Sequence, residues 1–117
     1  MKNFATAMLD GHLTSDPELR KTVNGKAVSF FSIAVNHGFK NADGKEEVSY
    51  FDIEAWGKMG ENCKQYLSKG RKVTIQGELK QDRWITPDGT NRQKVKIVAS
   101  SVRFDSMPHN GEKNKAA

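Results

Sequence analysis

The chain has 117 residues, the length of one domain with room for one modest hydrophobic core. No apolar run approaches the roughly 20 residues of a membrane-spanning helix, and the N-terminal Met1-Lys2-Asn3-Phe4 lacks the apolar stretch of a signal peptide. The single cysteine, Cys63, excludes an internal disulfide. We therefore expect a cytoplasmic protein with no membrane partner.

The formal net charge of +5 is concentrated in one part of the chain. Residues 1–68 carry eight Lys/Arg against nine Asp/Glu, and residues 97–117 add only +1. Residues 69–96 carry eight cations against three carboxylates, a net charge of +5. Such a cluster suggests a polyanionic partner, although a solvated lysine-rich surface explains it equally well.

Alternating apolar residues and turn signals predict three strands in the first half of the chain. The first covers residues 4–13, and the "SDPELRK" segment after it is expected to be a turn or short irregular stretch because it contains Pro17. Asn24-Gly25, a strong hairpin signal, precedes a strand at 27–36. A polar loop at 40–47 then leads to a strand at 47–56.

The second half begins with a switch to helical spacing. Met59, Cys63 and Leu67 lie four residues apart on one face, and Gly70 is expected to end this helix in the left-handed conformation. Two strands follow, at 72–79 with Val73, Ile75, Gly77 and Leu79 alternating inward, and at 93–100 after a Pro-Asp-Gly turn. From residue 106 the chain has few apolar residues, so we expect a flexible tail at 106–117.

This order of three strands, one helix and two strands is that of the OB-fold, a five-stranded Greek-key barrel that often binds oligonucleotides. We therefore predict an all-β fold with one short helix, and a single domain over residues 1–105.

The third predicted strand has two unlike faces, because side chains alternate along a strand. Phe51, Ile53 and Ala55 form an ordinary core face. The opposite face mixes two carboxylates with two large aromatics: Tyr50, Asp52, Glu54 and Trp56. That mixture is unusual for either a core or a solvated surface.

Four aromatic residues fall outside the core pattern: Phe39, Tyr50, Trp56 and Trp84. Basic residues lie close to three of them, namely Lys40 beside Phe39, Lys58 after Trp56, and Lys80 with Arg83 before Trp84. A single exposed tryptophan would more simply cover a loop or fill a subunit interface. Four aromatics interleaved with cations favour a surface on which bases stack while basic groups follow the backbone.

The segments "LDGHLTSDPELR", "GKAVSFFSIAVN", "YFDIEAWGKMGENCKQYLSKG", "VTIQGELKQDRW" and "DGTNRQKVKIVA" resemble a bacterial-type single-stranded DNA-binding protein, from about residue 5 to 105. The resemblance implies a non-enzymatic homotetramer that coats single-stranded DNA with little sequence preference, in replication, repair and recombination at the nucleoid. It implies base stacking on Phe39, Tyr50, Trp56 and Trp84, with weaker stacking at the first two because tryptophan is common there in the family. It implies phosphate contacts from Lys58, Lys80 and Arg83, and by looser matches from Lys40, Lys72 and Arg92. The chain ends in "EKNKAA" without the acidic tip of many members, so we do not expect recruitment of repair enzymes through the tail.

Two alternatives belong to other classes. One is an RNA-binding OB module of the cold-shock kind, which equal affinity for RNA and DNA would favour. The other is a metal-dependent hydrolase using Asp52 and Glu54, whose Cα atoms are roughly 6.6 Å apart on one strand face. Neither carboxylate has a histidine nearby in sequence, and the three histidines lack metal-ligand spacing. We therefore expect no catalytic residue, metal or cofactor.

Overall fold

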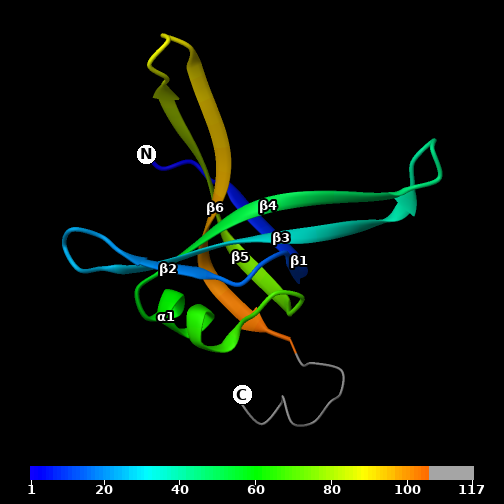
Figure 1. Cartoon of the computed structure of the whole chain (residues 1–117), viewed down its shortest axis with the longest axis horizontal. Helices are drawn as coiled ribbons and strands as arrows, with labels where there is room; N and C mark the ends of the chain where they lie inside the picture. The colour runs from blue at the N-terminus through cyan, green and yellow to red at the C-terminus, as the bar shows by residue number, and fades with distance from the viewer. Residues whose placement is uncertain (106–117) are drawn as a thin grey trace.

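The computed structural model describes residues 1–105. Six strands form a closed sheet, one helix packs against it, and the β3–β4 and β5–β6 hairpins project from it (Figure 1). The elements are β1 (Thr6–Leu13), β2 (Glu18–Lys21), β3 (Ala27–Lys40), β4 (Glu46–Trp56), α1 (Gly57–Tyr66), β5 (Lys72–Ile85) and β6 (Asn91–Phe104). The spatial order is β1-β5-β6-β4-β3-β2, and β1 also pairs with β3, which closes the ring. The predicted fold, mostly strand with one short helix in an OB-type barrel, is confirmed.

The core lies inside the ring because every second side chain of each long strand points inward. Four isoleucines, one from each of β3, β4, β5 and β6, are fully buried there: Ile33, Ile53, Ile75 and Ile97. The helix contacts β2, β3 and β4 and adds Cys63 to the same core, with Met59 packed against it. The predicted inward faces of β4 and of α1 are therefore correct.

One predicted turn is a strand. Residues 18–21 form β2, which pairs with β3 from Glu18↔Phe30 to Lys21↔Ala27 across the turn at Asn24-Gly25. The hairpin predicted at that turn is confirmed, and Gly25 has the positive φ of 84° that the turn requires. The strand before it was missed because it is only four residues long and follows Pro17.

The strands beyond the barrel are longer than predicted. β3 continues to Lys40, β5 continues to Ile85, and β6 covers Asn91–Phe104 where the sequence predicted only 93–100. Backbone pairing continues along both projecting hairpins, although their side chains face solvent and show no apolar alternation. Leu79, predicted to point inward, is 39% exposed because β5 leaves the barrel there.

The helix is shorter than predicted. It ends at Tyr66, and its C-cap Leu67 already has an extended backbone. Gly70 has the expected positive φ of 89°, but it lies in the following turn, where its N–H donates to the Leu13 carbonyl at 2.8 Å. The tail predicted at 106–117 lies outside the described residues.

Candidate nucleic-acid interface

The four aromatic residues singled out in the sequence all lie at the surface. Phe39 is 60% exposed, Tyr50 67%, Trp56 39% and Trp84 47%. Large aromatic rings usually pack inward or at an interface, so four exposed rings on a domain of this size indicate a contact surface.

Tyr50 and Trp56 lie on the outer face of β4. They pair with Ala34 and Val28 of β3, and because they are an even number of residues apart they face the same way. The path between them along the strand is about 20 Å. The two rings are therefore separate platforms on one face.

Phe39 lies farther out on the β3–β4 hairpin. The register of β3 against β4 shifts between Asn36 and Lys40, where Gly38 has a φ of 81°. Such an irregularity re-aims the side chains that follow it. Phe39 lies beside His37, with ring centroids 6.4 Å apart, and His37 Nε2 is 2.8 Å from Ser49 Oγ.

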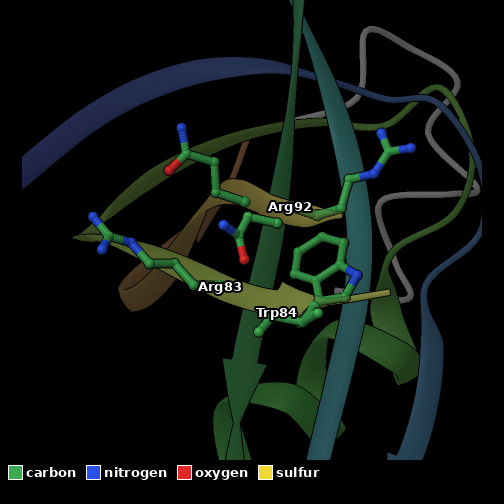
Figure 2. A pocket seen from close by; sticks show the side chains of 6 residues that line it. Arg83, Trp84 and Arg92 are labelled. Carbon is green, nitrogen blue, oxygen red and sulfur yellow. The ribbon is translucent and has the colours of Figure 1, made fainter. Parts of the chain in front are cut away.

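The second projecting hairpin, here called the arm, consists of residues 80–85 of β5, residues 91–96 of β6 and the turn between them. Trp84 is the Cα partner of Arg92 there. A pocket of about 730 Å³ is lined by Arg83, Trp84, Ile85, Asn91, Arg92 and Gln93. Figure 2 shows the Trp84 ring on the side of the arm toward Arg92, with the Arg83 side chain pointing away from it. An aromatic face and a guanidinium thus lie together on the arm.

The turn of the arm is held by its own hydrogen bonds. Gly89 N–H donates to the Thr86 carbonyl at 2.8 Å, and Thr86 N–H donates to the Thr90 carbonyl at 2.9 Å. The Asp88 carboxylate accepts from the Thr86 hydroxyl and from Thr90 N–H, and these bonds lower the pKa of Asp88. The turn therefore has a defined shape close to Trp84.

The carboxylates on the aromatic face of β4 are paired with lysines from β6. Lys94 Nζ lies 2.7 Å from Asp52 Oδ2, and Lys96 Nζ lies 2.5 Å from Glu54 Oε2 and 3.1 Å from Asp82 Oδ2. Hydrogen bonding to Glu54 is the main cause that raises the pKa of Lys96. The mixture of charges and aromatics on β4 is thus explained, because the negative charges are neutralised from a neighbouring strand.

This pairing also changes the meaning of the basic cluster at 69–96. Lys94 and Lys96 form ion pairs with carboxylates of β4. Arg71 donates a hydrogen bond to the Tyr66 carbonyl at 3.1 Å, at the end of α1. Among residues 1–105, no ion pair involves Lys80, Arg83 or Arg92 of the arm. Within the described part of the chain, these three cations of the arm thus have no carboxylate partner.

The remaining predicted cations are not all brought together. Lys58 lies in the first turn of α1, two residues after Trp56, and Lys40 is the Cα partner of Glu46 near the end of the β3–β4 hairpin. Lys72 begins β5 beside His12 of β1, about 40 Å along the strand from Trp84. The structure therefore separates Lys72 from the arm, and its role stays a prediction.

Sequence reasoning missed Phe30. This residue lies on the outer face of β3, between Glu18 of β2 and Glu54 of β4, and the Arg20 guanidinium carbon is 5.4 Å from its ring centroid. It also lines a pocket of about 370 Å³ at the base of the arm. The signal was present in Phe30-Phe31, because two adjacent residues of a strand face opposite sides and Phe31 is in the core.

Within residues 1–105 no group of three His, Cys, Asp or Glu side chains is arranged to hold a metal ion. No helix in this part of the chain is long and apolar enough to cross a membrane.

Comparison with known proteins gives consistent matches. The family described as "Single-strand binding protein family" matches residues 4–105. The Single-stranded DNA-binding protein of Treponema pallidum is 46% identical over 105 residues, covering 89% of this chain and 59% of the relative. The Single-stranded DNA-binding protein B of Bacillus subtilis is 39% identical over 101 residues, covering 86% of this chain and 89% of the relative. The chain thus spans less than two thirds of the T. pallidum relative. The solved structure "Plasmodium falciparum SSB complex with ssDNA" has a TM-score of 0.80 at 24% identity, over 91% of this chain and 98% of the other.

Proposed function

Because the chain belongs to the Single-strand binding protein family, we propose that it coats single-stranded DNA with little sequence preference, as a binding protein and not as an enzyme. The observation that carries the proposal is the series of exposed rings on β4 and the two hairpins, with Arg83 and Arg92 next to Trp84 on the arm. Rings stack on any base, and cations contact any phosphate, so such a surface holds strands regardless of sequence.

Exposed single strands arise during replication, repair and recombination. We place the protein's role there, in association with the nucleoid. Phe39, Tyr50, Trp56 and Trp84 serve as stacking platforms in this proposal. The phosphate contacts come first from Lys58, Lys80, Arg83 and Arg92, and with less support from Lys40 and Lys72.

The test is a titration of intrinsic tryptophan fluorescence with oligo-dT. Stacking on Trp56 or Trp84 quenches indole emission, so we expect oligo-dT to quench the fluorescence until the sites are saturated. Duplex DNA should compete poorly with oligo-dT for binding. An oligo-U competitor distinguishes the cold-shock alternative, because equal affinity for RNA and DNA would support that reading. Absence of quenching and of any shift in an oligo-dT electrophoretic assay would refute the proposal.

We also propose that the protein is a homotetramer around which the strand wraps. Supporting this, β1 pairs with β3 only at His12 and Leu13, so residues 6–11 present an edge without a strand partner among residues 1–105. Met8 on that strand is 69% exposed. Sedimentation equilibrium tests the assembly, because a tetramer has four times the 13.1 kDa mass of one chain.

A further inference from the structure

Four side chains form a continuous chain from Trp56 to the arm. Trp56 Nε1–H donates to Glu54 Oε1 at 3.0 Å, and the other carboxylate oxygen, Glu54 Oε2, lies 2.5 Å from Lys96 Nζ. Lys96 Nζ is also 3.1 Å from Asp82 Oδ2 on the arm. Both oxygens of Glu54 are therefore used, one by the indole and one by the ammonium group.

Glu54 is nearly buried, with 9% of its surface exposed. Taking a carboxylate out of water costs free energy unless it is paired, so its position has to be maintained by these partners. Hydrogen bonding to Glu54 raises the pKa of Lys96 above its ordinary value, because the carboxylate favours the ammonium form. The Glu54–Lys96 ion pair thus holds a carboxylate in a defined position beside the partly exposed ring of Trp56.

A carboxylate beside a platform for a polyanion should by itself weaken binding, because it repels phosphates. Two contacts of Glu54 offset this repulsion. Lys96 neutralises its charge, and the other carboxylate oxygen accepts a hydrogen bond from the indole of Trp56. A ring held in one orientation before binding loses less conformational entropy when a base stacks on it. The geometry favours this second role over a chance surface charge.

We propose that Glu54 is a positioning residue for Trp56: it orients the indole face for stacking through the Nε1 hydrogen bond, and Lys96 holds Glu54 in place. This inference rests on the proposed function, because it assigns a role within the same surface. It makes Lys96 part of the framework that holds Trp56. Because Lys96 also contacts Asp82, the orientation of Trp56 is tied to the base of the arm.

A double-mutant cycle tests the proposal. Trp56→Phe keeps an aromatic face but has no N–H, so Glu54 cannot act on it. We expect Glu54→Ala to weaken binding of labelled oligo-dT about fivefold in the Trp56 protein, the size of one lost hydrogen bond. In the Trp56→Phe background the same change should cause no loss, and any residual effect should be a gain from the removed charge.

Glu61→Ala on α1 is the matched control, because it removes one exposed carboxylate elsewhere. It should not weaken binding. Thermal unfolding of each variant separates misfolding from lost affinity. Tighter or unchanged binding by Glu54→Ala, or the same loss in both backgrounds, would overturn the positioning role. A wild-type protein that does not bind oligo-dT would instead refute the proposed function.

A second readout needs no DNA. In a Trp84→Phe background, Trp56 supplies the single indole N–H signal in a ¹H–¹⁵N spectrum, since the chain has two tryptophans. Glu54→Ala should shift and broaden this signal, because the ring loses its acceptor. Glu61→Ala should leave it unchanged. An indole signal insensitive to Glu54→Ala would show that the hydrogen bond does not hold the ring.

Discussion

Trp84 and Arg92 are Cα partners across the arm, one on β5 and the other on β6. Both side chains line the same pocket, at a distance from the barrel core. If the proposed function holds, we expect a base stacked on Trp84 to bring its own phosphate within reach of Arg92. This pair is the simplest unit of the proposed binding surface, and its two parts make separable predictions.

Trp84→Ala should weaken oligo-dT binding by roughly 1–3 kcal/mol, the usual worth of one base stack. Trp84→Phe keeps an aromatic face and should cost clearly less. Because Trp84 is 47% exposed on the arm, the free energy of unfolding should change by no more than about 0.5 kcal/mol. Fluorescence anisotropy and thermal unfolding measure the two effects. A large loss of stability with affinity intact would contradict the stacking role.

Salt dependence should distinguish unpaired cations from paired ones. Each phosphate neutralised on a single strand contributes about −0.7 to the slope of log affinity against log salt. Arg92→Ala, Lys80→Ala and Arg83→Ala should each make that slope shallower by about this amount. Lys94→Ala should change it less, because Asp52 already lies 2.7 Å from that ammonium group. Equal slope changes for Arg92→Ala and Lys94→Ala would show that the Asp52 pair opens when DNA binds.

Gly60→Ala should destabilise the fold strongly. A Cβ atom at Gly60 would lie 2.2 Å from the backbone oxygen of Ala55, so α1 would have to move away from β4. The change would also disturb the 2.6 Å hydrogen bond that the Ser29 hydroxyl donates to the Gly60 carbonyl. We expect a loss of roughly 3 kcal/mol, as for severe overpacking, in urea unfolding.

Gly89→Ala is the matched comparison for Gly60→Ala. Gly89 has a φ of 87° but open space around it, so only backbone strain of roughly 1–2 kcal/mol is expected. If the two alanine variants lose equal stability, contact between α1 and β4 is not the cause of the effect at Gly60.

The Cys63 thiol should be inert in the folded protein. Burial raises its pKa from 9.0 to about 11, so almost no thiolate is present at pH 8. Labelling by iodoacetamide should therefore follow the unfolding of the protein and accelerate in urea. Fast labelling of the native protein would contradict the burial of Cys63 in the core.

The same shift predicts a loss of stability at high pH. Between pH 9 and about 11 the unfolded chain releases the Cys63 proton while the folded protein keeps it. Since the unfolded state then binds fewer protons, the free energy of unfolding falls as pH rises through this window. Cys63→Ala should lower stability at pH 7 by creating a cavity, but it should flatten this part of the pH profile. An unchanged profile would assign the loss to other groups.

Much of the barrel was predictable because its core residues follow a simple period. Ile53 and Ala55, or Val73 and Ile75, alternate strictly with polar residues, and Cys63 lies at helical spacing from Met59 and Leu67. The prediction of inward positions was wrong at Leu79, where β5 is still paired but has left the barrel. Pairing along a solvated hairpin depends on backbone hydrogen bonds, and these leave no apolar pattern in the sequence.

The candidate surface was predictable in its aromatics and not in its charges. The exposed positions of Tyr50 and Trp56 follow from the alternation on β4. The partners of Asp52 and Glu54 do not, because Lys94 and Lys96 arrive from a strand that lies parallel to β4 and about 40 residues later. A count of charges along the chain therefore cannot show that two of the eight cations at 69–96 are paired with carboxylates of β4.

β1 pairs along most of its length with β5, which is made much later. Thr6 pairs with Glu78 and His12 with Lys72, so during synthesis the first strand leaves the ribosome well before its partner on β5. The chain loses the entropy of closing these long loops before the strand pairing stabilises it, and such topologies fold in roughly milliseconds to seconds. Until then the edge of β1 is open to strands of other nascent chains. We therefore expect β1 to be open to mispairing during translation, when neighbouring copies on one messenger can pair with it in place of β5.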